Sequence, residues 1–141
     1  MENEKWITQG FILAGCTNIC GTLLFSRFFT NELLMEIDSK TFSGVGLGGI
    51  MLWGLAYIAI ACCYTKACAI SAVFALEKFF YTAVWVDWLA MHACELKAIY
   101  QQDILTGFFY SIYGVNDLTF GIFFLYAFIK AQKQKMETEN D

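Results

Sequence analysis

The stretch ACAISAVFALEKFFYTAVWVDWLAM, residues 67–91, decides the fold. It is apolar and long enough to cross a bilayer as one helix, which takes about 20 residues for roughly 30 Å of hydrocarbon. Glu77 and Lys78 nevertheless stand at its centre, where an ionised side chain costs roughly 2.5–3.5 kcal/mol on insertion scales. The sequence therefore predicts a membrane-spanning helix whose charged groups are compensated inside the protein.

The composition of the whole chain also favours a membrane protein. Its 141 residues are 58% hydrophobic, 18% aromatic and only 16% charged, whereas soluble domains carry about 25% charged residues. The length favours a single domain. The basic residues form no patch interleaved with aromatic side chains, so we expect the lipid bilayer, and no nucleic acid, as a partner.

Three more apolar runs resemble the first in length. Together they give four expected spans, approximately residues 6–29, 42–64, 67–91 and 104–129, and a charged tail over residues 130–141. The runs alternate too poorly for transmembrane strands, so each is predicted to be a helix. We therefore expect an all-α fold, an antiparallel up-and-down bundle of four transmembrane helices that forms one integral membrane domain.

The links between the runs add detail to this bundle. Residues 31–40 are acidic and amphipathic, and they predict a short interfacial segment between the first two helices. The link around Thr65 and Lys66 is so short that the second and third helices should be antiparallel neighbours. Asn18 and Gly21 interrupt the first run, and acidic residues precede it, so we expect a retained helix rather than a cleaved signal peptide.

The distribution of lysines predicts the orientation. Four spans bring both termini to one side of the membrane. That side carries more basic residues than the other, namely Lys5, Lys66, Lys130, Lys133 and Lys135. The positive-inside rule therefore places both termini in the cytoplasm.

Polar side chains at matching depth define the main candidate site. Asn18, Glu77, Lys78 and Asp117 lie near the centres of their runs, and Tyr57 lies within one helical turn of that depth. We expect these five residues to form a polar cluster near the bilayer midplane. Successive helical residues point in directions about 100° apart, so we expect Lys78 to pair with Asp117, and Glu77 to bond to Asn18 or Tyr57.

A second candidate group is Trp85, Asp87 and Trp88. These side chains could line the mouth of a pocket for an amphipathic ligand. Alternatively, the tryptophans are interfacial or packing residues, as is common near membrane surfaces.

The cysteines and the histidine give little sign of a metal or cofactor. The chain has six cysteines but no Cys-x-x-Cys motif, and His92 is its only histidine. Structural zinc sites usually take four Cys or His ligands at regular spacing. We therefore expect no metal site and no cofactor, and the cysteines are interpreted as small apolar filler.

Three functions fit this pattern. The first is a structural or accessory membrane protein, a homo-oligomer or a subunit of a larger complex, in which the cluster fixes the helix register. The second is binding or transport of a small molecule, ion or proton within the bundle. The third, a membrane enzyme acting on a lipid or quinone, is the weakest, and no catalytic residue is assigned. A water-accessible cavity reaching Glu77 would favour the second or third function, and a sealed cluster the first.

Overall fold

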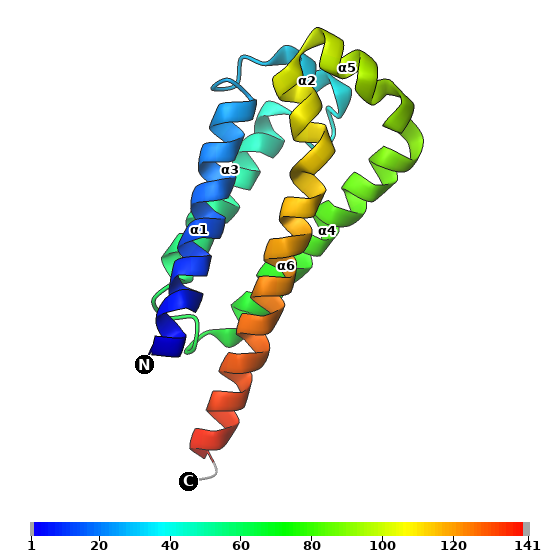
Figure 1. Ribbon diagram of the computed structural model, residues 1–141. Coiled ribbons are helices and arrows are strands. Elements are labelled where there is room, and N and C mark those ends of the chain that lie inside the picture. The colour runs from blue at the N-terminus through cyan, green and yellow to red at the C-terminus, as the bar shows by residue number, and fades with distance from the viewer. Residues whose placement is uncertain (1, 140–141) are drawn as a thin grey trace.

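The regular structure of the described chain is entirely helical (Figure 1). The computed structural model describes residues 2–139, with side chains described for residues 5–137. The predicted all-α class is confirmed. In chain order the elements are α1 (Glu2–Phe25), α2 (Glu32–Ile37), α3 (Gly44–Ile60), α4 (Cys68–His92), the 3-10 helix η1 (Ala93–Glu95), α5 (Leu96–Gln102) and α6 (Ile104–Glu139).

Three helical stretches are long and apolar enough to cross a membrane. They are Lys5–Phe25, Cys68–Gln102 and Ile104–Glu137. The remaining apolar run contains α3. This helix has only 17 residues and is shorter than the other three stretches. Its flanking residues form turns, so the run predicted over residues 42–64 is helical over a shorter part of its length.

The first predicted run extends too far at its C-terminal end. α1 ends at Phe25, and the next turn has left-handed backbone at Arg27, Phe28 and Phe29, with φ of 49°, 57° and 67°. Local hydrogen bonds hold this turn. The amide of Asn31 donates to the carbonyl of Ser26 over 2.9 Å, and the Ser26 hydroxyl accepts from the amide of Phe29 over 3.0 Å.

Two other segments are more helical than expected. The polar link before the last run contains η1 and α5. α6 continues to Glu139, so most of the predicted charged tail is helix, and residues 140–141 lie outside the described residues. The Ala, Gln, Lys, Met and Glu residues of this extension are strong helix formers. The expected short segment between the first two runs contains the helix α2.

The long helices pack mainly as two pairs, α1 with α3 and α4 with α6. In the first pair the backbones approach closely, because a Cβ built on Gly15 would lie 2.5 Å from the carbonyl oxygen of Gly54. In the second pair, Gly114 lies against the ring of Trp85 and Gly121 lies against Phe79. Small residues allow such close contact, which drives helix association in membranes.

A polar layer divides the apolar core into two parts. One part is built around Phe11, Tyr57, Phe74 and Phe124. The other contains Leu34, Phe42, Leu47, Trp88, Ile99, Tyr110 and Tyr113. Along α1, α4 and α6, the residues of the polar cluster stand between the residues of these two parts. The charges of this polar layer, Glu77, Lys78 and Asp117, therefore lie within the bundle.

Candidate functional site

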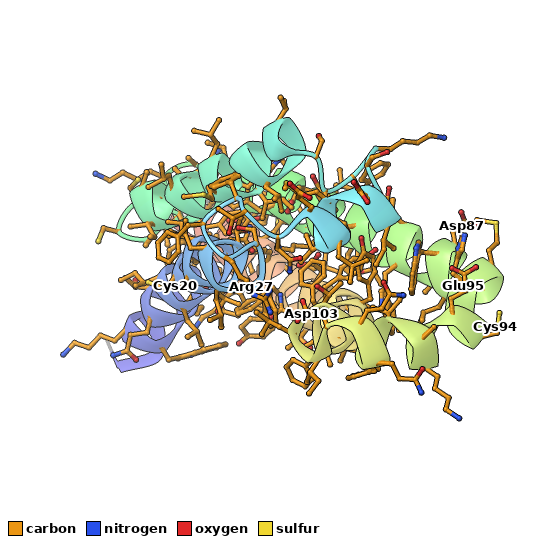
Figure 2. All side chains as sticks on the ribbon, turned by 90° about the horizontal axis from the view of Figure 1, so that it is seen from above. Cys20, Arg27, Asp87, Cys94, Glu95 and Asp103 are labelled. Carbon is orange, nitrogen blue, oxygen red and sulfur yellow. The ribbon has the colours of Figure 1, made fainter. Side chains whose placement is uncertain are left out.

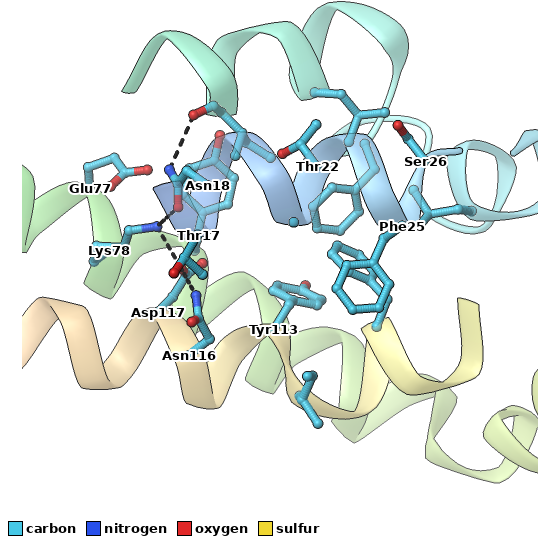
Figure 3. A pocket seen from close by; sticks show the side chains of 18 residues that line it. Thr17, Asn18, Thr22, Phe25, Ser26, Glu77, Lys78, Tyr113, Asn116 and Asp117 are labelled. Atoms are coloured by element: carbon cyan, nitrogen blue, oxygen red, sulfur yellow. Dashed lines mark hydrogen bonds and ion pairs between the residues drawn. The ribbon is translucent and has the colours of Figure 1, made fainter. Parts of the chain in front are cut away.

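The centre of the candidate site is a buried ion pair between α4 and α6. Lys78 Nζ lies 2.6 Å from Asp117 Oδ1, and it also donates to Asn18 Oδ1 of α1 over 2.9 Å (Figure 3). Only 2% of Lys78, 5% of Asn18 and 8% of Asp117 are exposed. One ammonium group thus joins three helices, and its carboxylate partner compensates its charge.

The cluster also includes α3. The Asn18 amide Nδ2 donates to the carbonyl oxygen of Ile50 over 3.2 Å. The hydroxyl of Tyr57, a fully buried residue, donates to Glu77 Oε2. Lys78 Nζ lies 5.6 Å from the centroid of the Tyr57 ring, within the range of a cation–π contact. Side chains of all four main helices therefore meet at one level.

All five residues predicted for the cluster are brought together. Lys78 pairs with Asp117, as expected. Glu77 was expected to bond to Asn18 or Tyr57, and it bonds to Tyr57. Asn18 bonds to Lys78 and not to Glu77.

Several polar atoms of the cluster have no protein partner. An ammonium group has three donors, and Lys78 uses two of them within the described chain. Both hydrogen bonds to the Asp117 carboxylate, from Lys78 and from the Asn116 amide at 3.3 Å, reach Oδ1, and no described residue bonds to Oδ2. Glu77 Oε1 and, beside the cluster, the Tyr113 hydroxyl are buried with no hydrogen-bond partner among the residues that the structure describes. The cluster thus keeps free hydrogen-bonding capacity.

A cavity of about 140 Å³ lies against this cluster, between the two helix pairs. One end is polar, and the other is rich in aromatic side chains but also includes Thr22 and Ser26 (Figure 3). The polar end is formed by Thr17, Asn18, Glu77, Lys78, Asn116 and Asp117, and the apolar end includes Phe25, Leu34, Phe42, Leu47, Phe109 and Tyr113. Such a shape suits a small amphipathic molecule.

The cavity wall includes residues that the sequence interpretation did not name, among them the polar residues Thr17, Thr22, Tyr113 and Asn116. Helical spacing could have found two of them. Thr22 is four residues after Asn18, and Tyr113 is four residues before Asp117, so each shares a helix face with a predicted site residue. The other two directly neighbour site residues in the sequence.

The second predicted group does not form a site. Trp85 donates from Nε1 to the carbonyl oxygen of Tyr110 over 2.8 Å, and Trp88 is 5% exposed with its ring centroid 4.5 Å from that of Tyr110. Asp87 is exposed and lies at the outer edge of the molecule in the view of Figure 2. A helical step of about 100° separates successive side chains, so the tryptophans pack on α6 while Asp87 points elsewhere.

A second charged cluster lies at one end of the bundle. Arg27 Nη2 is 2.6 Å from Asp103 Oδ1 (Figure 2). Asp103 Oδ2 accepts from the Thr106 hydroxyl over 2.5 Å, from the Thr106 amide over 3.2 Å and from the Asn31 amide over 3.3 Å. Asp103 thereby caps the first turn of α6.

The environment of Asp103 favours its ionised form. Burial opposes ionisation, but the hydrogen bonds from Thr106, the charge of Arg27 and the hydrogen bond from Asn31 outweigh it. They hold the pKa of the Asp103 carboxyl below its ordinary value. This carboxylate is therefore charged at neutral pH, with both of its oxygens bonded.

Metal binding finds no support in the described part of the chain. No group of three or more His, Cys, Asp or Glu side chains there could hold a metal ion. The cysteines are free thiols, and four of them, Cys16, Cys20, Cys62 and Cys94, are exposed. The chemistry of the candidate site consequently rests on its ammonium, carboxyl, amide and hydroxyl groups.

Known proteins give no further guide to this site. A comparison with them finds no matching family model, no similar curated protein and no similar solved structure. Function resides in a site more than in a fold, so the geometry of the polar cluster and its cavity is the basis for a functional inference.

Proposed function

We propose that this protein is a four-span integral membrane protein that binds a small molecule within its helix bundle. The observation that carries the proposal is the cavity of about 140 Å³ in contact with the Lys78–Asp117 pair. A protein in which this pair only held the helices together would gain nothing from an adjoining cavity. The cavity and the free hydrogen-bonding groups together favour a ligand.

The proposal of four spans includes α3. Its 17 residues extend about 25 Å and contain no charged side chain, which meets the lower limit of about 17 residues for a span. The start of α1 and the end of α6 lie at the same end of the molecule (Figure 1), as an even number of spans requires. The lysines near that end favour a cytoplasmic location for both termini.

The unused hydrogen-bond donor and acceptor of the ion pair support ligand binding. Buried ion pairs compensate their desolvation only when additional hydrogen bonds satisfy the remaining donors and acceptors. The third Lys78 donor and Asp117 Oδ2 lack such bonds within the described chain, and both residues line the cavity. A polar group of a ligand would complete the coordination of the pair.

The ion pair also has a structural role in this proposal. Through Asn18 it links α1 to the pair α4 and α6, across the boundary where the cavity lies. Stability and binding then depend on the same two charges, and experiments must separate the two roles.

The topology can be tested with native cysteines. Cys62, in the link between α3 and α4, and Cys94, in η1, are both exposed and lie near opposite ends of the bundle (Figure 1). A membrane-impermeant maleimide should label Cys94 in intact cells and Cys62 only after permeabilisation, with Cys94→Ser and Cys62→Ser as controls. With the N-terminus in the cytoplasm, the reverse pattern, in which Cys62 is labelled in intact cells and Cys94 only after permeabilisation, would contradict a span at α3. Labelling of both sites from the same side would show that α4 does not cross the membrane.

Binding can be tested in lipid nanodiscs by fluorine NMR with a panel of ring-sized probes, neutral, cationic and anionic. A Cβ built on Gly21, in the cavity wall, meets no atom within 4 Å, and the same holds for Gly49, which is not among the cavity residues. Gly21→Leu should reduce the binding of at least one probe by about tenfold or more, because its side chain fills the cavity, and Gly49→Leu should not. The proposal fails if no probe distinguishes the wild type from Gly21→Leu.

A further inference from the structure

We infer that the ligand is a hydroxyl compound with an apolar body about the size of one aromatic ring, a phenol or a small aromatic alcohol. Its hydroxyl group would lie between Lys78 Nζ and Asp117 Oδ2, and its ring among the aromatic side chains of the cavity. The inference rests on the proposed function and specifies the chemical class of the ligand.

The size of the cavity sets the size of the ligand. Its volume is about 140 Å³, and an engineered apolar cavity of about 150 Å³ in another protein holds one benzene molecule. Fused rings or the head group of a phospholipid would exceed this space. A single ring with one small polar substituent would fill it.

The polar end of the cavity offers one donor and one acceptor. The donor is the third N–H of Lys78, and the acceptor is Asp117 Oδ2, which no described residue engages. A hydroxyl group both donates and accepts, so it can satisfy both atoms at once. A carbonyl or ether oxygen only accepts and would leave the carboxylate oxygen without a partner.

The mutual compensation of Lys78 and Asp117 favours a neutral ligand between them. The Lys78 ammonium is already compensated by the Asp117 carboxylate at 2.6 Å. A cationic ligand would place a second positive charge beside Lys78, and an anionic one a second negative charge beside Asp117. Like charges at such distances repel strongly in a poorly solvated site.

The apolar end of the cavity suits an aromatic ring. The ring of Phe42 meets those of Phe109 and Tyr113 edge to face, with centroid distances of 4.9 Å and 5.0 Å. Aromatic rings prefer such edge-to-face or offset contacts. A ligand ring could therefore extend an arrangement that the protein already contains, beside the Tyr113 hydroxyl, to which no described residue bonds.

The test compares probes of nearly equal shape. 4-Fluorophenol and 4-fluorotoluene differ by a hydroxyl in place of a methyl group. Their affinities are measured by fluorine NMR with protein in nanodiscs and corrected for partition into empty nanodiscs. We expect 4-fluorophenol to bind at least about tenfold more tightly, because hydrogen bonds to charged groups stabilise complexes by this order. In the variant Lys78→Met with Asp117→Leu, this preference should disappear.

Gly21→Leu provides a second test if that double variant fails to fold. It should weaken the binding of 4-fluorophenol at least about tenfold, while Gly49→Leu, whose added side chain also meets open space, should leave it unchanged. If Gly21→Leu bound 4-fluorophenol with unchanged affinity, this cavity would not be the binding site of the hydroxyl compound.

The other outcomes separate this inference from the proposed function. Equal binding of 4-fluorophenol and 4-fluorotoluene, both blocked by Gly21→Leu, would overturn the inferred ligand class and support a binding cavity. Tighter binding of 4-fluorobenzylammonium, with Glu77 as its counter-charge, or of 4-fluorobenzoate would also overturn the inference. Absence of binding by every probe would overturn both proposals.

Discussion

Two ion pairs within the described residues, one in the core and one at the end of the bundle, have the same length but different surroundings. Lys78–Asp117 and Arg27–Asp103 each join their charged atoms over 2.6 Å. In the first pair the side chains of the cation and the anion are 2% and 11% exposed, whereas in the second pair the values are 54% and 14%. One pair lies between the two parts of the core, and the other lies at the end of the bundle.

The pairs also differ in how completely their hydrogen bonds are satisfied. Both oxygens of Asp103 are bonded, and the residue caps α6 beside the left-handed turn that ends α1. Among the described residues, hydrogen-bond donors reach only one oxygen of Asp117, and the pair borders a cavity. A cluster at a helix end whose carboxylate oxygens are all bonded stabilises the fold. A cluster beside a cavity that keeps an unbonded carboxylate oxygen is suited to bind a further molecule.

The largest difference should appear when one cation is removed from each pair. Lys78→Met leaves the Asp117 carboxylate buried and unpaired, and we expect a loss of roughly 3–5 kcal/mol in the free energy of unfolding in detergent. Arg27→Met should cost less than about 1 kcal/mol, because Arg27 is exposed. Thermal unfolding of the two variants measures both values.

A double-mutant cycle controls this prediction. Lys78→Met combined with Asp117→Leu removes both charges, so it should recover part of the stability lost by either single change. Asp117→Asn alone should be destabilising as well. Additive losses in the double variant would show that the two side chains do not act as a pair.

A smaller effect is expected from the neutral partner of Lys78. Asn18→Ala removes one acceptor of the ammonium group and the contact with Ile50, and it should destabilise the protein by about 1.5–3 kcal/mol. Asn18→Asp is a useful counterpart, since it keeps an acceptor oxygen. If Asn18→Ala unfolded at the wild-type temperature, the proposed link between α1 and the ion pair would be wrong.

The stability of the turn at the end of α1 should depend on the backbone conformation that the residue at position 28 can adopt, and not on charge. Phe28 has φ of 57° and is 74% exposed. Left-handed backbone costs a residue with a Cβ roughly 1–2 kcal/mol, so Phe28→Gly should be more stable than Phe28→Ala by about 1 kcal/mol. Both variants lose the same ring, which makes the comparison independent of lipid contacts. Equal unfolding temperatures would argue against the left-handed turn.

The smallest effect concerns pH and is confined to the end of the bundle. The pKa of Asp103 is below its ordinary value in the folded protein, so its contribution to stability is present above the unfolded pKa of about 3.9. That contribution is lost as pH falls through the still lower folded pKa. The stability difference between wild type and Asp103→Asn should hold from about pH 7 to about pH 5 and shrink below about pH 4. A difference that grows on acidification would contradict this assignment.

The cluster was predictable because charges in apolar runs have few alternatives. Glu77, Lys78 and Asp117 had to find polar partners, and helical depth and direction limited the choices to a few. The sequence also contains the signal for the helix cap at Asp103, since an aspartate directly before an apolar helical run commonly marks a helix N-terminus. Patterns of residue type were sufficient for both features.

The cavity and the end of α1 were not predictable in the same way. A cavity is the space that side chains leave, so it depends on how Phe25, Phe42 and Tyr113 pack and not on any one residue type. Phe28 and Phe29 prolong the apolar run beyond Ser26 and Arg27, although the helix has already ended at Phe25. Hydrogen bonds of Ser26 and Asn31 hold the turn at that boundary. Hydropathy does not report such bonds.

The most direct test of this account is the contact between Lys78 and Asp117 in lipid. Protein labelled at lysine Nζ and aspartate Cγ, in bilayers, should show by solid-state NMR a dipolar coupling that matches an Nζ–Oδ1 distance of 2.6 Å. The coupling should vanish in Asp117→Asn. The pair formed by Arg27 and Asp103 gives no coupling in this experiment because arginine is not labelled. If the wild type lacked this coupling, the ion pair that organises the bundle and its cavity would not exist in the membrane.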